Sequence, residues 1–309
     1  MQYWPFVKYE LIIVRYGEIA LKAKATRRRF ENALINNIGN ALKTKWISFR
    51  ITREWGRIYV YTNQIDESIG VLQKIFGIIS ISPAIQTQSN MGSISSLAVN
   101  ISKKVLTEEK TFAIRVTRTG EHKYTSQDIA VKIGNDVVKV TKAGVNLTKP
   151  DFELFIEIRD KNAYLFTEKI CCVGGFPLRT QGKVLVFVDC IESILAAWYI
   201  MRRGCKSIFL NADMSVSDVL STFIDRWYAD QDVVMVDTKK PIYRCINDVA
   251  SMRECITLVT GHSLYNVSHN VLSDLRLLNE QVNILVLHPL IAMEKKEIHN
   301  KCREIGLLT

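Results

Sequence analysis

The sequence predicts a mixed α/β protein whose N-terminal half is α+β and whose C-terminal half is a doubly wound parallel sheet. Two observations carry this prediction. In the first half, β-type runs follow one another directly, whereas in the second half apolar runs without alternation are separated by helical stretches. The chain has 309 residues, so two or three domains are expected. With 48% hydrophobic and 23% charged residues, the composition excludes disordered, collagen-like and low-complexity classes.

The first section, residues 1–80, is expected to follow the order β-α-β-β-α-β. Apolar residues recur at helical spacing in the two stretches expected to be helices, 24–45 and 69–76. The expected strands are 11–14, 46–52, 57–61 and 78–81, with Trp55-Gly56 as a hairpin turn. This order is the split βαβ, or ferredoxin-like, pattern.

The middle section, residues 81–173, is expected to be a small α/β unit. Its expected helices are 94–106 and 126–140, and its expected strands are 111–117, 152–159 and 163–168. The sequence Gly174-Gly175-Phe176-Pro177 then marks a domain boundary.

The last section, residues 174–309, is expected to be a parallel sheet with helices on both faces. The expected strands are 184–188, 207–210, 233–236, 256–259 and 284–287, and the clearest helices are 193–203, 216–228 and 295–305. A ligand site in such a domain is expected at the carboxyl ends of the strands.

The net charge of +10 is concentrated in the first half of the chain. Residues 1–77 carry a net +7, residues 78–173 a net +3, and residues 174–309 are neutral. Such asymmetry favours a polyanion such as nucleic acid as partner of the N-terminal part. The alternative is a solvated basic face without a partner.

Other classes of protein are not supported by the sequence. It shows no run of about 18 apolar residues and no basic-then-apolar leader, so neither a membrane partner nor secretion is expected. The seven cysteines are scattered, which favours a reducing cytoplasm over a disulfide framework. Cys171-Cys172 lacks metal-ligand spacing. His262 and His269, seven residues apart, could share a helix face, but nothing else converges on them, so no metal site is expected.

Motifs along nearly the whole chain resemble those of the tRNA 4-thiouridine synthetase, or tRNA sulfurtransferase, family. They are Arg15-Tyr16-Gly17-Glu18-Ile19-Ala20-Leu21-Lys22, Gly174-Gly175-Phe176-Pro177, Thr180-Gln181-Gly182-Lys183, Val259-Thr260-Gly261-His262-Ser263-Leu264 and Met293-Glu294-Lys295-Lys296-Glu297-Ile298. The resemblance implies a ferredoxin-like domain (1–80), a THUMP domain that binds RNA (81–173) and a PP-loop ATPase-like domain (174–309). In active relatives the last domain uses ATP and Mg²⁺.

With the resemblance, tRNA is the expected partner, gripped at its acceptor end by the two N-terminal domains. Basic side chains neutralise phosphates and release counterions. The candidate RNA-binding residues are Lys22, Lys24, Arg27, Arg28, Arg29, Arg115, Arg118 and Lys123.

The nucleotide loop departs from the family pattern. Relatives have Ser-Gly-Gly-Ile-Asp-Ser, whereas this chain has Val188-Asp189-Cys190-Ile191-Glu192-Ser193, without glycines and with a carboxylate where phosphate should bind. Other positions of the expected pocket are also changed, so ATP binding is expected to be weak or absent. The positions of this degenerate pocket are Val188, Asp189, Ser193, Asn211, Ala212, Arg244, Gly261 and Asn270.

No catalytic residue is assigned from the sequence. The family's sulfur-carrying cysteine would follow Ile305-Gly306, where this sequence ends at Thr309. Cys190 is flanked by Asp189 and Glu192, which disfavour a thiolate, so it is expected to be an apolar filler.

Three hypotheses follow. The first is a tRNA-binding module, alone or beside a second copy, a separate thiolation enzyme or a sulfur carrier. The second is an active ATP-dependent sulfurtransferase with a variant pocket and an external sulfur source. The third is a protein scaffold without an RNA role, which predicts no salt-dependent tRNA binding.

Overall fold

The computed structural model describes residues 8–21, 23–237, 239–265 and 271–308. Its elements divide into two compact units by their internal contacts. The first unit comprises Met1–Arg15, Leu42–Gln73 and Ser80–Cys172, and the second comprises Tyr16–Ala41, Lys74–Ile79 and Val173–Thr309. Within the described ranges, no helix is long and apolar enough to cross a bilayer.

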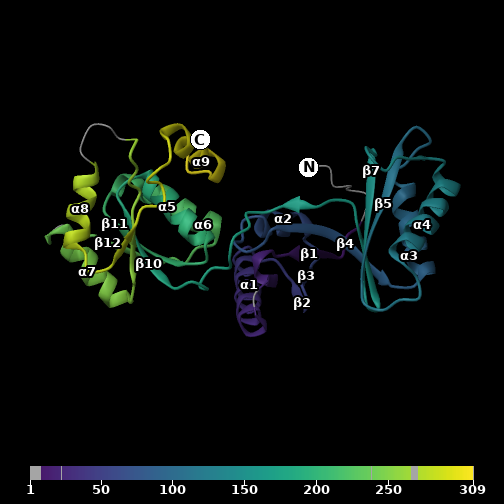
Figure 1. Ribbon diagram of the computed structural model, residues 1–309, viewed down its shortest axis with the longest axis horizontal. Coiled ribbons are helices and arrows are strands. Elements are labelled where there is room, and N and C mark those ends of the chain that lie inside the picture. The colour runs from purple at the N-terminus through teal and green to yellow at the C-terminus, as the bar shows by residue number, and fades with distance from the viewer. Residues whose placement is uncertain (1–7, 22, 238, 266–270, 309) are drawn as a thin grey trace. The chain divides into compact units, whose positions relative to one another are not determined.

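The first unit is built on one nine-stranded sheet (Figure 1). Its main order is β2 (Arg50–Glu54), β3 (Arg57–Tyr61), β1 (Leu11–Arg15), β4 (Ser80–Gln88), β8 (Asn162–Phe166), β7 (Phe152–Arg159), β5 (Thr111–Thr119) and β6 (Gly144–Val145). A short β9 (Ile170–Cys171) also pairs with β4. The neighbours β2-β3-β1-β4 are antiparallel, which confirms the predicted ferredoxin-like arrangement.

Strand β4 is longer than the sequence pattern predicts. The predicted strand ended before Pro83, but β4 continues through that residue to Gln88, pairing first with β1 and then with β8. The proline is tolerated because the Ala84 carbonyl accepts from Glu10 N–H on the β1 side, so the neighbouring Pro83 nitrogen faces the other way.

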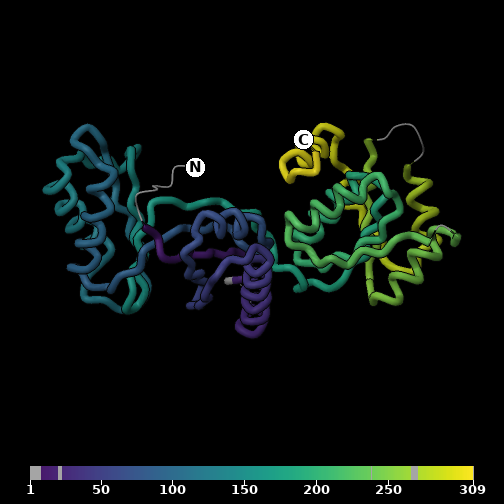
Figure 2. Tube along the Cα trace, turned by 180° about the vertical axis from the view of Figure 1, so that it is seen from behind, coloured from purple at the N-terminus to yellow at the C-terminus, as the bar shows by residue number. Residues whose placement is uncertain are grey.

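Helices cover one face of the sheet in the THUMP part of this unit. They are α3 (Met91–Lys103) and α4 (Ser126–Thr141), and both views place them on the same side of the strands (Figure 2). Ile94 and Ile133 pack there against Leu154 and Ile156. The opposite face carries a second cluster in which Tyr59 stacks on Tyr164 with ring centroids 4.6 Å apart.

Two predicted boundaries near the start of the chain were wrong. Helix α1 runs from Lys24 to Thr44, and the strand that follows is Arg50–Glu54 because residues 46–49 close the helix and turn the chain. Helix α2 (Ile65–Leu72) begins four residues before its prediction, with Asp66 and Glu67 in its first turn. A short η1 (Glu18–Leu21) precedes α1.

The second unit contains a five-stranded sheet whose strands are all parallel, as predicted. The order is β12 (Val233–Met235), β11 (Lys206–Asn211), β10 (Lys183–Val188), β13 (Thr257–Val259) and β14 (Leu285–Leu287).

Helices lie on both faces of this sheet (Figure 1). Alternate residues of β10 explain why: Val186 belongs to a core with α5 (Ile191–Arg202), α6 (Ser217–Trp227) and α9 (Lys295–Ile305). Leu185 belongs to a separate core with α7 (Ile242–Arg253) and α8 (Val271–Gln281). This confirms the doubly wound fold. A short η2 (Met214–Val216) precedes α6.

Candidate nucleic-acid interface and nucleotide site

The first two turns of α1 carry a dense group of cations. Lys24, Arg28 and Arg29 are exposed, and Arg27 is half-buried with its Nε 4.0 Å from Glu31 Oε1. The Arg29 guanidinium lies over the Phe30 ring at 5.3 Å. Lys22 lies outside the described residues.

This placement is electrostatically unfavourable for the helix alone. The N-terminus of a helix carries a partial positive charge that acidic side chains normally offset. The first turn of α1 has no acidic residue, and Arg27 and Arg28 add positive charge there. An anion near this end would relieve the repulsion, so the geometry suits phosphate.

The predicted cations of the middle section differ in availability. Arg115 is engaged in the fold, since its Nε lies 2.8 Å from Glu153 Oε1 and its Nη2 donates to the Leu147 carbonyl at 2.7 Å. Arg118 is exposed near the end of β5 and donates to the Gly120 carbonyl, and Lys123 is exposed in the loop between β5 and α4. Arg118 and Lys123 are therefore the better placed of the three to reach a phosphate.

Sequence reasoning missed a cluster of three arginines around Glu157, a buried side chain in the second half of β7. Glu157 oxygens lie 3.4 Å from Arg15 Nη2, 2.8 Å from Arg57 Nε and 2.7 Å from Arg159 Nε. The partners come from β1, β3 and β7, up to 142 residues apart in the chain. Only Arg159, two residues after Glu157 on the same strand face, gave a local signal.

The cluster holds a surplus of positive charge. Burial acts to raise the pKa of Glu157, but the charges of Arg57, Arg15 and Arg159 lower it below its usual value. Burial lowers the pKa of Lys169, and Arg15 adds to that effect. Glu157 is therefore ionised at neutral pH and balances only part of the positive charge around it.

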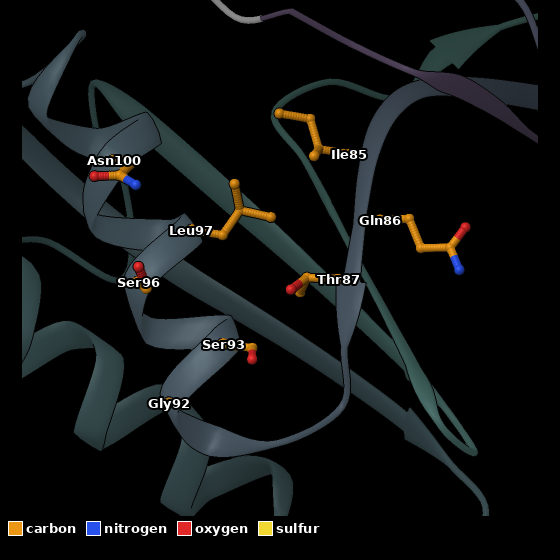
Figure 3. Close-up of a pocket in the computed structure, with 8 residues that line it drawn as sticks. All are labelled: Ile85, Gln86, Thr87, Gly92, Ser93, Ser96, Leu97 and Asn100. Atoms are coloured by element: carbon orange, nitrogen blue, oxygen red, sulfur yellow. The ribbon is translucent and has the colours of Figure 1, made fainter.

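An uncharged polar cavity of about 460 Å³ lies between α3 and the second half of β4 (Figure 3). Thr87 and Leu97 face one another across it, while Gln86 points away from the helix. Its lining is rich in hydroxyl and amide groups and has no charged side chain: Ile85, Gln86, Thr87, Gly92, Ser93, Ser96, Leu97 and Asn100. Such a lining supplies neutral hydrogen bonds but cannot neutralise phosphate.

In the second unit, the start of α5 is occupied by a carboxylate. Val188 is buried at the end of β10, and only Asp189 and Cys190 separate it from the helix. The Ser193 hydroxyl, itself fully buried, donates to Asp189 Oδ1 at 2.5 Å, and Cys190 Sγ lies 3.3 Å from the same oxygen. A phosphate at this helix end would meet a negative charge.

Beside this turn lies a cavity of about 450 Å³. Three carboxylates line it, from Asp189, Glu192 and Asp213, together with the Lys295 ammonium and the His299 ring on α9. Tyr265 Oη donates to Glu192 Oε1 at 3.2 Å. The net character of the lining is acidic, which disfavours a triphosphate.

The thiols of this cavity are held in the protonated state. Burial, with the charge of Asp189, raises the pKa of Cys190 to about 12. Burial, with the charge of Glu192, raises that of Cys302 to about 11. Neither cysteine forms the thiolate that a nucleophile requires. Among the described residues, no group of three or more His, Cys, Asp and Glu side chains could hold a metal ion.

Gly261 has a packing role. A Cβ at this position would lie 2.5 Å from the Ser193 backbone nitrogen and 2.7 Å from the Glu192 carbonyl carbon. The loop after β13 therefore approaches the backbone of α5 more closely than any side chain permits.

The remaining predicted pocket positions do not converge on this cavity. Asn211 is buried and donates from Nδ2 to Ser217 Oγ at 2.8 Å, which ties β11 to the start of α6. Ala212 is exposed and donates its N–H to the Val188 carbonyl. Arg244 is exposed in the first turn of α7 and is not part of the cavity lining. Asn270 lies outside the described residues.

Two histidines meet at the carboxyl ends of β13 and β14. Thr260 Oγ1 lies 2.8 Å from His262 Nδ1 and 2.7 Å from His288 Nδ1. Burial lowers the pKa of His288, and the nearby His262 lowers it further. His288 Nε2 is buried without a hydrogen-bond partner among the described residues, so the neutral ring is favoured.

Family models match three parts of the chain. The ThiI ferredoxin-like domain matches residues 11–82, the THUMP domain residues 88–168, and the model of the thiamine biosynthesis protein ThiI residues 210–309. The third match begins after the turn at Asp189.

Whole-chain relatives agree with these matches. A "Probable tRNA sulfurtransferase" of Methanothermobacter thermautotrophicus is 34% identical over 335 aligned positions, covering 96% of this chain and 85% of the relative. A relative of the same name from Methanocaldococcus jannaschii is 33% identical, covering 96% and 87%. Each alignment is longer than the chain, so these relatives carry residues that it lacks.

Solved structures show the same fold. A Pyrococcus horikoshii protein matches with a TM-score of 0.84 and 29% identity, covering 96% of this chain and 99% of that one. A 4-thiouridine synthetase in complex with RNA and ATP matches with a TM-score of 0.80 and 24% identity, covering 97% and 85%. Because whole-chain relatives are more than 30% identical over 96% of this chain, the chain belongs to the tRNA sulfurtransferase family.

Proposed function

We propose that this chain is a tRNA-binding member of its family that does not bind ATP in the family's manner. The tRNA is held through the ferredoxin-like and THUMP domains, for which we keep the boundaries 1–80 and 81–173. Thiolation, where it occurs, then depends on a partner: a second copy of the chain, a separate thiolation enzyme or a sulfur carrier.

RNA binding is supported by the cations at the start of α1. Lys24, Arg27 and Arg28 crowd the positive end of a helix that has no acidic residue in its first turn. Such a group costs stability unless an anion is bound, and phosphate is the anion that tRNA supplies. The matched synthetase structure contains RNA, which is consistent with the proposal.

The observation that carries the loss of ATP binding is the Asp189 carboxylate at the start of α5. It accepts a hydrogen bond from Ser193 and stands where a phosphate-binding loop would offer backbone N–H groups. The residues present therefore do not fit ATP with Mg²⁺ in the family's manner.

Filter binding of tRNA at about 50 and 200 mM salt tests the RNA role. Binding is expected to weaken steeply with salt, and Arg27→Ala/Arg28→Ala/Arg29→Ala is expected to lower affinity about 10-fold or more and to flatten the salt slope by about 2. The control removes three exposed cations elsewhere in the same unit: Lys239→Ala/Lys240→Ala/Lys296→Ala. Equal losses in both variants, or no salt dependence, would contradict tRNA binding through α1.

Calorimetric titration with ATP and Mg²⁺ tests the nucleotide half of the proposal. No heat of binding is expected at millimolar nucleotide. Saturable binding that is lost in Arg244→Ala would instead support an active sulfurtransferase with a variant pocket. Gly261 is unsuitable for this test, because any side chain there displaces the α5 backbone.

A further inference from the structure

Trp46 stands at a position where a tryptophan is unfavourable for the fold. It follows the last turn of α1 with a φ of +56°, and its side chain is 92% exposed. Ile47 N–H donates to the Leu42 carbonyl and Trp46 N–H to the Lys43 carbonyl. This hydrogen-bond pattern is the Schellman ending of a helix, in which the left-handed residue is usually glycine.

The fold gains little from this residue. A left-handed conformation strains a side chain with a Cβ, and an exposed indole leaves a large apolar area in water. An observed backbone outlier of this kind points toward a role outside the fold.

A second exposed tryptophan lies at the other end of the next strand. Trp55 is 67% exposed in the turn between β2 and β3. The turn is held by two arginines of the Glu157 cluster: Arg159 Nη1 donates to the Trp55 carbonyl at 2.8 Å, and Arg57 Nη1 to the Gly56 carbonyl at 2.7 Å. These hydrogen bonds hold the backbone of the turn that carries the Trp55 indole.

The segment from Lys43 to Arg57 joins the two tryptophans and is strongly basic. It carries five cations and a single acid, Glu54. Its strand β2 pairs only with β3 in the described sheet and so forms one margin of it. Arg50 is exposed there, with its guanidinium 4.0 Å from the centre of the Tyr61 ring.

We propose that this basic margin, the segment from Lys43 to Arg57 along β2, binds unpaired nucleotides of RNA. Bases stack on Trp46 and Trp55, and phosphates meet the exposed cations of the segment, which are Lys43, Lys45, Arg50 and Arg53. Aromatic rings interleaved with basic side chains are the usual platform for single-stranded nucleic acid. A protein strand added to β2 is disfavoured, because arginines on an edge strand oppose pairing with another chain. The inference rests on the proposed RNA role and adds to it a contact that is specific for unpaired nucleotides.

Two labelled RNA probes separate this contact from general phosphate binding: a 12-nucleotide oligouridylate and a 12-base-pair RNA duplex. Trp46→Gly is expected to weaken oligouridylate binding about 5-fold or more, and Trp55→Ala to do the same. Duplex binding should change less than about 2-fold, since the phosphate contacts remain. Trp46→Gly should leave Tm unchanged or higher, because glycine suits the left-handed position. A purely structural role cannot lower affinity while preserving stability.

Met252→Ala is the control, since it removes an apolar side chain of similar exposure from the second unit. Oligouridylate affinity equal to the parent in both tryptophan variants overturns the inference. So does sedimentation showing that Trp46→Gly only abolishes self-association, which would make the margin a protein interface. If the parent binds neither probe nor tRNA, the proposed function itself fails. If tRNA binding and its dependence on Arg27–Arg29 persist while the tryptophan variants are neutral, only this inference fails.

Discussion

The arginine cluster around Glu157 and the carboxylate-lined cavity beside α5 differ in the sign of their charge and in whether they are packed or open. In the first, three guanidinium groups surround one buried carboxylate. In the second, Asp189, Glu192 and Asp213 line a cavity of about 450 Å³ together with Lys295 and His299. The first is packed and holds strands together, whereas the second is hollow and has room for a ligand.

The difference shows that the cavity beside α5 and the excess positive charge of the chain lie in different regions. Beside the turn where the sequence predicts a nucleotide loop, there is room for a ligand, but the lining is acidic. The positive charge instead gathers on α1, on the β5–α4 loop and along β2. A polyanion is therefore expected at the N-terminal domains and not at the parallel sheet.

The largest effect is expected from removing the central carboxylate of the arginine cluster. Glu157→Gln leaves three guanidinium groups without their counter-charge and should lower the free energy of unfolding by about 3–5 kcal/mol. Urea denaturation measures it. Glu153→Gln is the matched control on the same strand; its pair with Arg115 is more exposed and should contribute less than about 1 kcal/mol. Similar losses in the two variants would show that the cluster is not a buried network.

The next effect concerns the packing of α5. Gly261→Ala should lower the free energy of unfolding by about 1–3 kcal/mol, because its Cβ meets helix backbone at 2.5 Å. Gly134→Ala is the opposite case. In the middle of α4, an added Cβ would meet no described atom outside the helix's own backbone within 4 Å, so the substitution should raise stability by about 0.5–1 kcal/mol. An unchanged free energy of unfolding in Gly261→Ala would contradict the packing role of this glycine against α5.

A smaller effect is expected from neutralising the carboxylate at the start of α5. Asp189→Asn should lower the pKa of Cys190 from its value of about 12, while burial, the larger cause, keeps it raised. Alkylation of Cys190 at about pH 9, followed by mass spectrometry, should increase about 2- to 5-fold. Cys302 serves as the internal control, because its raised pKa comes from burial and Glu192. Equal acceleration at both cysteines would indicate a loosened cavity.

The smallest effect is a pH dependence from His288. Its pKa in the folded state lies below the ordinary value of 6.5, so the unfolded chain binds the proton more readily. Stability present above about pH 6.5 is lost as pH falls through the depressed pKa. His288→Asn should reduce the fall in Tm between pH 7.5 and 5.5 by about 1–2 °C relative to the parent. An unchanged or steeper fall in the variant would contradict this assignment.

Much of the fold could be predicted from the sequence, because local periodicity reports it. The bounds of β3 (Arg57–Tyr61), β7 (Phe152–Arg159) and α9 (Lys295–Ile305) match their predictions residue for residue. Errors occurred where a tertiary partner overrides a local signal. The sequence pattern predicts that the strand ends before Pro83, but the missing N–H of this proline faces away from β1 and costs no bond there.

The candidate sites could be predicted only in part. The start of α1 and the altered turn at Asp189 are contiguous in sequence and were found there. The Glu157 cluster joins residues up to 142 positions apart and leaves no local pattern. The sequence predicts Gly261 as a pocket residue, and only the folded structure brings it against the α5 backbone. No sequence pattern marks Trp46 as a binding residue, because what sets it apart is its left-handed backbone conformation.

Strand β4 has a consequence for how the first unit unfolds. Its Ser80–Ala84 half is paired with β1 and its Ile85–Gln88 half with β8, along one uninterrupted backbone. If either half of β4 unfolds, the other half loses the ordered backbone that continues from it. The ferredoxin-like and THUMP strands should therefore unfold as one cooperative unit. Hydrogen exchange should report a single protection level across this strand, and a chain cut after residue 80 should fail to fold on either side.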